Sequence, residues 1–130
     1  MARILLIDDD DQVRGAIRRI LERAGYTVVD APDGAAGIRA QREQPADVII
    51  TDIFMPQQDG IETIRQLRRE FPGGKIIAIS GGDRTRTMDL RKDAELFGAS
   101  RTLGKPFELS ELLNAVRELL GEPRPGVEEP

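Results

Sequence analysis

Residues 4–11 read Ile-Leu-Leu-Ile-Asp-Asp-Asp-Asp, four aliphatic side chains followed directly by four carboxylates. The aliphatic run is apolar at every position, which is typical of a strand that is covered on both faces in a parallel sheet. The carboxylates therefore come at the carboxyl end of a strand, next to the start of a helix. The rest of the chain repeats this arrangement of a short apolar run followed by a helical segment.

We expect strands at residues 4–7, 26–29, 48–51, 76–79 and, more weakly, 101–103. Between them, apolar residues recur at three- and four-residue spacing, which predicts helices at residues 13–24, 61–71, 88–97 and 109–120. A weaker helix is expected to follow the Asp33-Gly34 turn and to run through Ile38, with Pro45 closing it ahead of the third strand. This alternation predicts an α/β fold, an open doubly wound sheet of five parallel strands with helices on both faces. In such sheets the sites lie beyond the carboxyl ends of the strands.

The length of 130 residues allows one hydrophobic core and leaves no room for a second output domain of ordinary size. We expect the domain to cover residues 1–120. Residues 121–130 are rich in Pro, Gly and Glu, so we expect a disordered tail there. No apolar run approaches the roughly 20 residues that cross a bilayer, and the N-terminus is not a secretory signal. We therefore expect a cytoplasmic protein.

The chain contains no cysteine and no histidine, so carboxylates, hydroxyls and lysine remain for chemistry. The net charge of −4 offers little attraction to nucleic acid, so we expect no direct DNA binding. Two expected helices carry arginine triplets, which we interpret as solvated helix faces rather than binding stripes. These are Arg14, Arg18 and Arg19 on the first helix and Arg65, Arg68 and Arg69 on the third.

The four aspartates after the first strand have different expected roles. Asp10 or Asp11 fits the N-cap of the first helix, because a carboxylate there accepts backbone N–H bonds. Asp8 and Asp9 lie too early to cap the helix. Two adjacent carboxylates repel each other unless a cation or a base lies between them, so this pair indicates a hard divalent ion.

The third strand ends at Asp52 and is followed by the irregular residues 53–60. Met55-Pro56 and Asp59-Gly60 supply the turn chemistry of this stretch, which leaves Asp52 without a structural role. If the first and third strands are neighbours, Asp52 joins the Asp8-Asp9 pair. The resulting group of oxygen ligands suits Mg²⁺.

Ser80 follows the fourth strand and Lys105 follows the fifth. Each residue alone has an ordinary explanation, as a turn serine or a solvated amine. Together with the carboxylates at the same edge, they suit phosphoryl transfer to Asp52. In that reaction the Asp52 carboxylate attacks, Mg²⁺ and Lys105 neutralise the phosphoryl charge, and Ser80 donates a hydrogen bond.

Four motifs carry a resemblance to the response-regulator receiver family of two-component systems, and the likeness spans residues 3–120. They are Ile-Leu-Leu-Ile-Asp-Asp-Asp, Asp-Val-Ile-Ile-Thr-Asp-Ile-Phe-Met-Pro-Gln-Gln-Asp-Gly, Ile-Ile-Ala-Ile-Ser-Gly and Lys-Pro-Phe. The resemblance implies a flavodoxin-like sheet with strand order 2-1-3-4-5. It also implies a single-domain response regulator that signals through protein–protein contacts or a phosphorelay and is not an enzyme beyond its own phosphorylation and dephosphorylation.

The resemblance assigns a role to each candidate residue. It implies that Asp52 is the phosphoacceptor and that Ser80 and Lys105 contact the phosphoryl group. It also implies that Mg²⁺ is bound by Asp9, Asp52 and the backbone carbonyl of Phe54, with Asp8 acting mainly through a water. The donor is then a phosphohistidine on a sensor histidine kinase or a histidine phosphotransfer protein. The downstream partner is an unidentified protein, membranes and nucleic acid are not partners, and the chain is a monomer or weak dimer.

Two features depart from the family. The family usually carries an aromatic residue three positions before its lysine, where this chain has Thr102, so output through another surface is expected. Residues 81–96 are also a few residues longer than usual. Their Gly-Gly-Asp-Arg-Thr-Arg-Thr start is compatible with a loop over the site or with a solvated linker.

Three other classes of protein share part of this sequence pattern. A Mg²⁺-dependent phosphatase of the haloacid-dehalogenase kind normally places a second Asp two residues after its nucleophile, where this chain has Phe54. An interaction module that keeps the fold without being phosphorylated remains open. A dinucleotide-binding domain would need glycines after the first strand, where this chain has aspartates.

Overall fold

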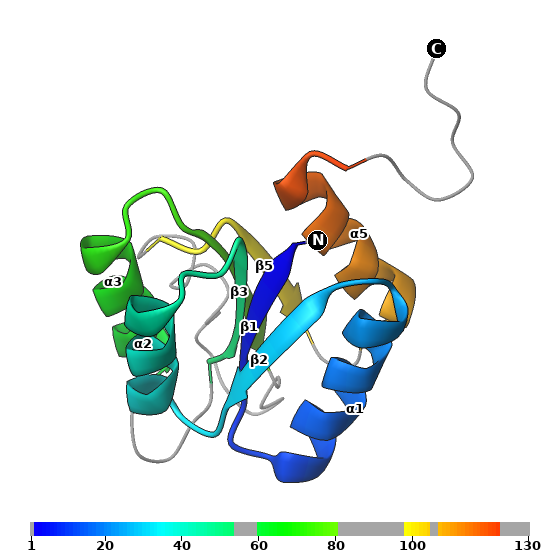
Figure 1. Cartoon of the computed structure of the whole chain (residues 1–130), viewed down its shortest axis with the longest axis horizontal. Coiled ribbons are helices and arrows are strands. Elements are labelled where there is room, and N and C mark those ends of the chain that lie inside the picture. The colour runs from blue at the N-terminus through cyan, green and yellow to red at the C-terminus, as the bar shows by residue number, and fades with distance from the viewer. Residues whose placement is uncertain (1, 54–59, 81–97, 105–106, 123–130) are drawn as a thin grey trace.

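The computed structural model describes residues 2–53, 60–80, 98–104 and 107–122. Its elements are β1 (Arg3–Ile7), α1 (Asp11–Arg23), β2 (Thr27–Ala31), α2 (Gly34–Glu43), β3 (Val48–Asp52), α3 (Gly60–Glu70), β4 (Lys75–Ser80), β5 (Arg101–Gly104) and α5 (Leu109–Leu120). Figure 1 shows their arrangement. The helix expected at residues 88–97, the long segment 81–96 and most of the expected tail lie outside the described residues.

The five strands form one parallel sheet in the order β2-β1-β3-β4-β5. Helices α1 and α5 cover one face of this sheet, and α2 and α3 cover the other (Figure 1). The predicted doubly wound sheet and its strand order are therefore confirmed. With this order, β1 and β3 are neighbours near the centre, so the residues that follow them emerge side by side.

Strand β1 shows why the central strands are apolar at every position. Ile4 and Leu6 pack in the cluster shared with α1 and α5, whereas Leu5 and Ile7 pack in the cluster shared with α2 and α3. All four side chains are at most 1% exposed. Because both faces of the sheet are covered, no position in such a strand is available for a polar side chain facing water.

The ends of the helices follow from local hydrogen bonds. Asp10 Oδ1 accepts from the backbone N–H groups of Gln12 and Val13, at 2.9 and 3.1 Å, so Asp10 rather than Asp11 is the N-cap of α1. Gly121 ends α5 in the left-handed conformation at φ 74°, which glycine adopts without steric cost.

Helix α2 runs through Ile38 to Glu43, so it ends just ahead of Pro45, as predicted. The sequence signal was weakened by Gln41, a polar residue on the buried side of the helix that is 2% exposed. Its amide group is satisfied locally, since Oε1 accepts from the backbone N–H of Ala46 at 2.8 Å. A buried glutamine can therefore replace an apolar residue here without leaving an unpaired polar group.

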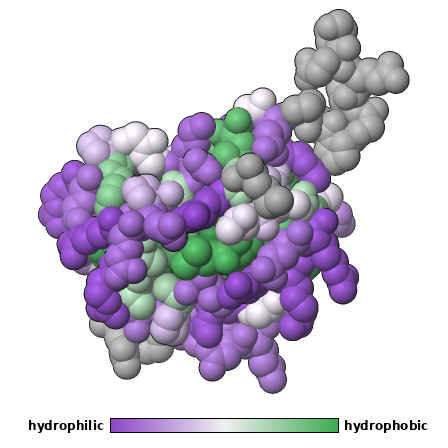
Figure 2. Space-filling view, in the orientation of Figure 1, coloured by the Kyte–Doolittle hydropathy of each residue, from purple (hydrophilic) through white to green (hydrophobic). Residues whose placement is uncertain are grey.

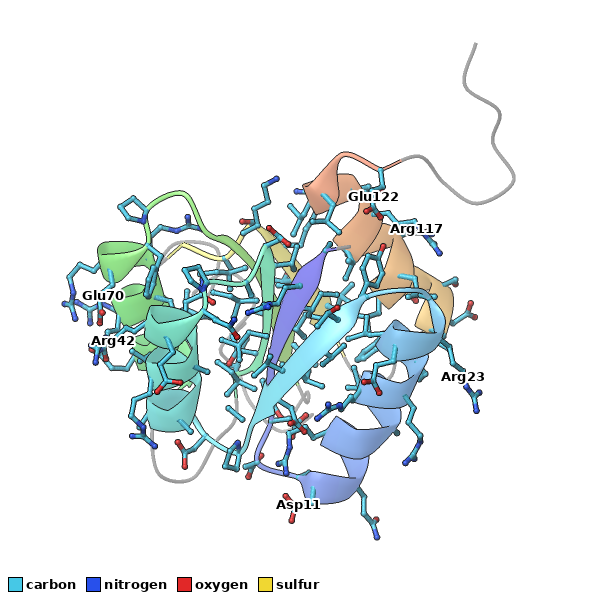
Figure 3. The ribbon with its side chains drawn as sticks, viewed as in Figure 1. Asp11, Arg23, Arg42, Glu70, Arg117 and Glu122 are labelled. Carbon is cyan, nitrogen blue, oxygen red and sulfur yellow. The ribbon has the colours of Figure 1, made fainter. Side chains whose placement is uncertain are left out.

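Two arginine contacts join elements on the α2/α3 side. Arg42 donates two hydrogen bonds of 2.7 Å to the carboxylate of Glu70 and so links α2 to α3 (Figure 3). Hydrogen bonds from Arg42, and then from Gln66, lower the pKa of Glu70 to about 2. Arg68 donates to the carbonyl oxygens of Gly74 and Gly98, at 2.6 and 3.2 Å. The interpretation of Arg68 as part of a solvated face was therefore wrong.

The face of the molecule drawn in Figure 2 is mostly hydrophilic, and an apolar strip on it lies between α1 and α2 with hydrophilic residues around it. Within the residues described above, no helix has the length and apolar character needed to span a membrane.

Candidate functional site

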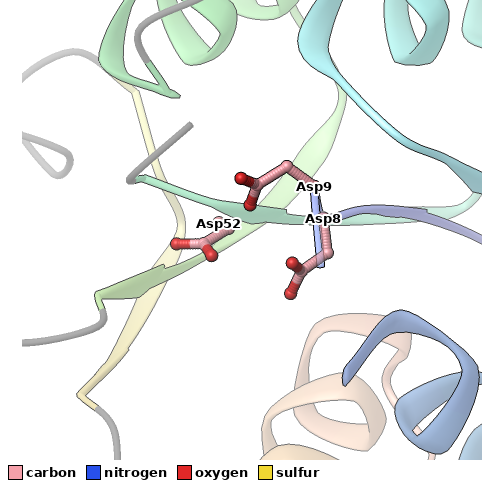
Figure 4. A group of neighbouring side chains, drawn as sticks. All are labelled: Asp8, Asp9 and Asp52. Carbon is pink, nitrogen blue, oxygen red and sulfur yellow. The ribbon is translucent and has the colours of Figure 1, made fainter. Parts of the chain in front are cut away.

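Three carboxylates meet at the carboxyl edge of the sheet. In the parallel register, Ile7 lies opposite Thr51, so Asp8 emerges beside Asp52. The carboxylates of Asp8, Asp9 and Asp52 offer oxygen atoms that all lie within 4.8 Å of one another (Figure 4). The predicted convergence of these residues is therefore observed.

The three aspartates differ in exposure. Asp8 and Asp52 are 1% and 6% exposed, whereas Asp9 is open to solvent. Asp8 is held by its own backbone and by the turn that follows. Its N–H donates to the carbonyl of Ala31 at 3.1 Å, and its Oδ1 accepts from the N–H of Asp10 at 2.9 Å. A rigid buried carboxylate thus lies beside one that solvent can reach.

This donor set has the chemistry of a hard-cation site. Carboxylate oxygens are the ligands that Mg²⁺ and Ca²⁺ prefer, and Mg²⁺ in particular uses a few carboxylates together with retained water molecules. Three negative charges this close repel one another, and a divalent cation among them relieves that repulsion. The solvent-facing side of Asp9 leaves space for water ligands. The three aspartates therefore fit Mg²⁺.

Asp52 is the last residue of β3, whose five residues are all buried. Its position is defined by backbone hydrogen bonds on either side of the strand end. The N–H of Ile53 donates to Ile79 on β4 at 2.9 Å, and the N–H of Gly60 donates to Ile53 at 3.0 Å. The start of α3 is thereby tied to the end of β3, next to the Asp52 carbonyl.

The remaining predicted site residues are described only in part. Ser80 ends β4, and its backbone lies opposite Gly104 of β5, so both strands end at the same edge as β1 and β3. Lys105 follows Gly104 directly in the sequence, but Lys105 and Phe54 lie outside the described residues. Thr102 lies in β5 opposite Ala78. The roles predicted for these residues stay predictions.

Sequence reasoning missed Arg14, which was interpreted as part of a solvated helix face. Its side chain is 16% exposed, and its Nη1 donates to the backbone carbonyl of Asp8 at 2.8 Å. It also donates to Asp11 and Asp30. Burial alone would lower the pKa of Arg14, but the hydrogen bonds to Asp11 and Asp30 outweigh it and raise the pKa above its ordinary value. Only its place one helical turn after the aspartates hinted at such a contact.

Comparison with known proteins agrees with the fold. The sequence model of the response regulator receiver domain matches residues 4–117. The response regulator receiver protein CpdR of Brucella abortus is 36% identical over 120 residues, which cover 92% of this chain and 98% of that protein. The response regulator MprA of Mycobacterium leprae is 37% identical over 95% of this chain, which spans about half (53%) of MprA.

Solved structures give the same result. A response regulator receiver domain protein from Clostridium thermocellum aligns with a TM-score of 0.85 at 29% identity, covering 93% of this chain and 95% of that one. The response regulator TrrA from Thermotoga maritima, solved in complex with Mg²⁺ and BeF, aligns with a TM-score of 0.80 at 28% identity. That alignment covers 92% of this chain and 99% of TrrA.

The doubly wound sheet and the acidic edge are those of a signalling domain of two-component systems. The chain belongs to the response regulator receiver family. Receiver domains of two-component systems are phosphorylated, interact with histidine kinases and downstream proteins and act in signalling, and this is the general function of the present chain.

Proposed function

We propose that Asp52 is the residue of this receiver that accepts the phosphoryl group, and that the transfer depends on Mg²⁺. The observation that carries this proposal is the meeting of Asp52 with Asp8 and Asp9 within 4.8 Å at one edge of the sheet. Asp52 comes from the central strand β3, so it has neighbouring strand ends on both sides. The dependence on Mg²⁺ is supported by similarity to TrrA, which was solved in complex with Mg²⁺ and BeF.

Asp9, Asp52 and the carbonyl of Phe54 would hold the ion directly, and Asp8 would act mainly through a water. A bound Mg²⁺ neutralises charge on the phosphoryl oxygens and so favours attack by an anion. One oxygen of Asp52 forms a bond to phosphorus while the bond from phosphorus to the imidazole nitrogen of the donor breaks. The product is an acyl phosphate, which water hydrolyses at the same site.

The residues at the ends of the fourth and fifth strands complete the proposal. Ser80 donates a hydrogen bond to a phosphoryl oxygen, and the ammonium group of Lys105 pairs with the phosphoryl charge. The donor is a phosphohistidine on a sensor kinase or phosphotransfer protein in the cytoplasm. The chain turns over no external substrate, contacts neither nucleic acid nor membrane directly, and signals through a protein partner as a monomer or weak dimer.

The test is incubation of the protein with acetyl phosphate and Mg²⁺, followed by intact mass measurement. The mass should rise by one phosphoryl group in the wild type and stay unchanged in Asp52→Asn. The matched control is Asp47→Asn, which removes the same charge from an exposed aspartate just before β3, at the opposite end of the strand. It should be phosphorylated like the wild type, and chelation of Mg²⁺ should abolish the reaction.

The competing hypothesis is an interaction module that keeps the fold but is not phosphorylated. Wild-type protein that gains no mass, with or without Mg²⁺, would support that alternative. Gain of mass by Asp52→Asn at the wild-type rate would instead show that another residue is the acceptor.

A further inference from the structure

Arg14 lies under the turn that joins β1 to α1, and all three nitrogens of its guanidinium group donate hydrogen bonds. Nε donates to Asp30 Oδ2 at 3.1 Å, and Nη2 donates to Asp11 Oδ1 at 2.7 Å. Nη1 donates to the carbonyl oxygen of Asp8 at 2.8 Å. The Arg14 side chain is only 16% exposed, and its hydrogen bonds to Asp8 and Asp30 are partly buried, whereas the Asp11 carboxylate is 83% exposed.

The carbonyl oxygen of Asp8 that accepts from Arg14 belongs to the peptide unit that links Asp8 to Asp9, two candidate metal ligands. A peptide unit is planar, so fixing its oxygen also fixes the direction in which the chain continues into Asp9. On the other side, the N–H of Asp8 is bound to Ala31 of β2. The Asp8–Asp9 backbone is therefore held from both sides, and Arg14 supplies one of the hydrogen bonds that hold it.

Arg14 is itself fixed by its neighbours. The carboxylate of Asp30 on β2 accepts from Arg14 through Oδ2 and from Arg18 Nη1 through Oδ1, the latter at 2.9 Å. Asp11, the first residue of α1 (Figure 3), accepts a hydrogen bond from Arg14 Nη2. A guanidinium group bound at three points has one orientation, which a flexible ammonium group cannot reproduce.

We propose that Arg14 is a positioning residue of the metal site, which holds the Asp8–Asp9 peptide in the orientation that Mg²⁺ binding requires. This inference rests on the proposed function above. Arg14 does not contact the ion in this proposal. It acts through the backbone, in the manner of the outer hydrogen bonds that orient metal ligands in other proteins.

The positive charge of Arg14 and its hydrogen bond to Asp8 should change the affinity for Mg²⁺ in opposite directions. The direction of the change in an Arg14 variant therefore tests the proposal. As a nearby positive charge, Arg14 repels a dication, so its removal would tighten Mg²⁺ binding if charge alone mattered. As the residue that fixes the ligand backbone, it favours binding, so its removal would weaken Mg²⁺ binding. The direction of the change therefore distinguishes the two effects.

The experiment is a MgCl₂ titration of the full chain followed by amide chemical shifts, for wild type, Arg14→Met, Arg14→Lys and Arg18→Met. Methionine and lysine are about as favourable as arginine in a helix, so α1 is preserved. Arg18→Met is the matched control. It also removes one positive charge and one hydrogen bond to Asp30, but Arg18 does not donate to the Asp8 carbonyl as Arg14 does.

We expect the Mg²⁺ dissociation constant to rise about tenfold in Arg14→Met, the lower end of the range for residues that orient metal ligands. Arg14→Lys should bind at least as weakly, since it keeps the repelling charge without the three-point geometry. Arg18→Met should bind as the wild type does or slightly more tightly. In the absence of Mg²⁺, the amide signals of Asp9 and Asp10 should shift in both Arg14 variants and stay in place in Arg18→Met.

An unchanged or smaller dissociation constant in Arg14→Met, with wild-type binding intact, would overturn the role of Arg14 and leave the proposed function standing. Wild-type protein that binds no Mg²⁺ would overturn the proposed metal site and this inference together. If Arg14→Met does not fold, Arg14→Lys decides, because wild-type affinity in that variant would show that the charge, and not the three-point geometry, is what matters.

Discussion

The N–H of Gly60 donates to the carbonyl oxygen of Ile53 at 3.0 Å, so the first residue of α3 lies against the end of β3. A Cβ atom on Gly60 would lie 2.3 Å from that oxygen and 2.6 Å from the carbonyl oxygen of Asp52. Both contacts are with backbone, which cannot turn aside as a side chain can. The absence of a side chain at Gly60 is therefore what lets α3 begin beside the candidate phosphoacceptor.

Gly60→Ala should accordingly destabilise the protein by about 1–3 kcal/mol, the usual cost of overpacking, and slow its phosphorylation by acetyl phosphate. Urea unfolding and intact mass over time measure the two effects. Gly15→Ala is the control, since a Cβ there meets only Arg19 Nη1 at 3.9 Å within α1. That change should stabilise the protein by about 0.5–1 kcal/mol through helix propensity. Equal effects of the two substitutions would contradict this explanation.

Gly37 allows α2 to approach the sheet closely. A Cβ at this position would lie 2.3 Å from Ile7 Cδ1, and Ile7 is fully buried and cannot move into solvent. Gly37→Ala should lower the free energy of unfolding by about 1–3 kcal/mol despite the better helix propensity of alanine. The cost should shrink in an Ile7→Ala background, where the clashing atoms are gone. Additive effects in this double-mutant cycle would show that the clash is not the cause.

Neutralising one carboxylate of the acidic group should stabilise the protein when Mg²⁺ is absent. Asp9→Asn removes one negative charge beside Asp8 and Asp52, so the free energy of unfolding should rise by up to about 1 kcal/mol in dilute buffer. The gain should fall as NaCl is added, because salt screens exposed charges. With saturating MgCl₂ the order should reverse, since the wild type gains more from the ion. Thermal unfolding of the wild type and Asp9→Asn, with Asp47→Asn as control, measures these differences. A lower stability of Asp9→Asn in the absence of Mg²⁺ would contradict this explanation.

Tyr26, the single tyrosine of the chain, should make stability fall at high pH. Burial, and then the 2.8 Å hydrogen bond to Glu122, raises the pKa of Tyr26 to about 12. Because the folded pKa lies above the unfolded value near 10, the contribution to stability is complete below pH 10 and is lost as pH rises through 12. Two pKa units correspond to about 2–3 kcal/mol.

The measurement is the difference in unfolding free energy between wild type and Tyr26→Phe across that pH window. Both proteins contain the same lysines, so the contribution of lysine ionisation cancels in this difference. Tyrosinate absorbance reports the same ionisation directly. Glu122→Gln should lower the titration midpoint only part of the way towards 10, because burial is the larger cause. A tyrosinate midpoint near 10 in the folded wild type would refute this account.

Much of the fold was predictable because its causes are local. A strand that is buried on both faces needs an unbroken apolar run, and residues Ile4 to Ile7 form one. A helix that covers one face of the sheet needs apolar residues at helical spacing, and α1 and α5 have them. The sequence signal of helix α2 was weaker because Gln41 interrupts the apolar pattern and is satisfied by Ala46, a contact that the pattern does not encode.

The acidic part of the candidate site was also predictable, because parallel strands point the same way and residues that follow them reach one edge. If β1 and β3 are neighbours, as the structure shows, Asp8, Asp9 and Asp52 must come together at that edge. The direction of the strands gave no indication of Gly60 as the residue that seats α3 against β3. That relationship depends on how closely two backbones approach each other, which residue type alone does not specify.

The sequence by itself thus determined the order of strands and helices, the apolar faces and the edge at which the carboxylates meet, because these depend on periodicity and chain direction. Only the tertiary structure decided which charged side chains face inward. Arg14 and Arg19 look alike in the sequence, yet Arg14 is partly buried and hydrogen-bonded to Asp8 and Asp30, whereas Arg19 is exposed. The reason is physical: the rotation of α1 against β1 and β2 is set by the packing of the whole core, and that rotation selects which arginine meets the carbonyl of Asp8.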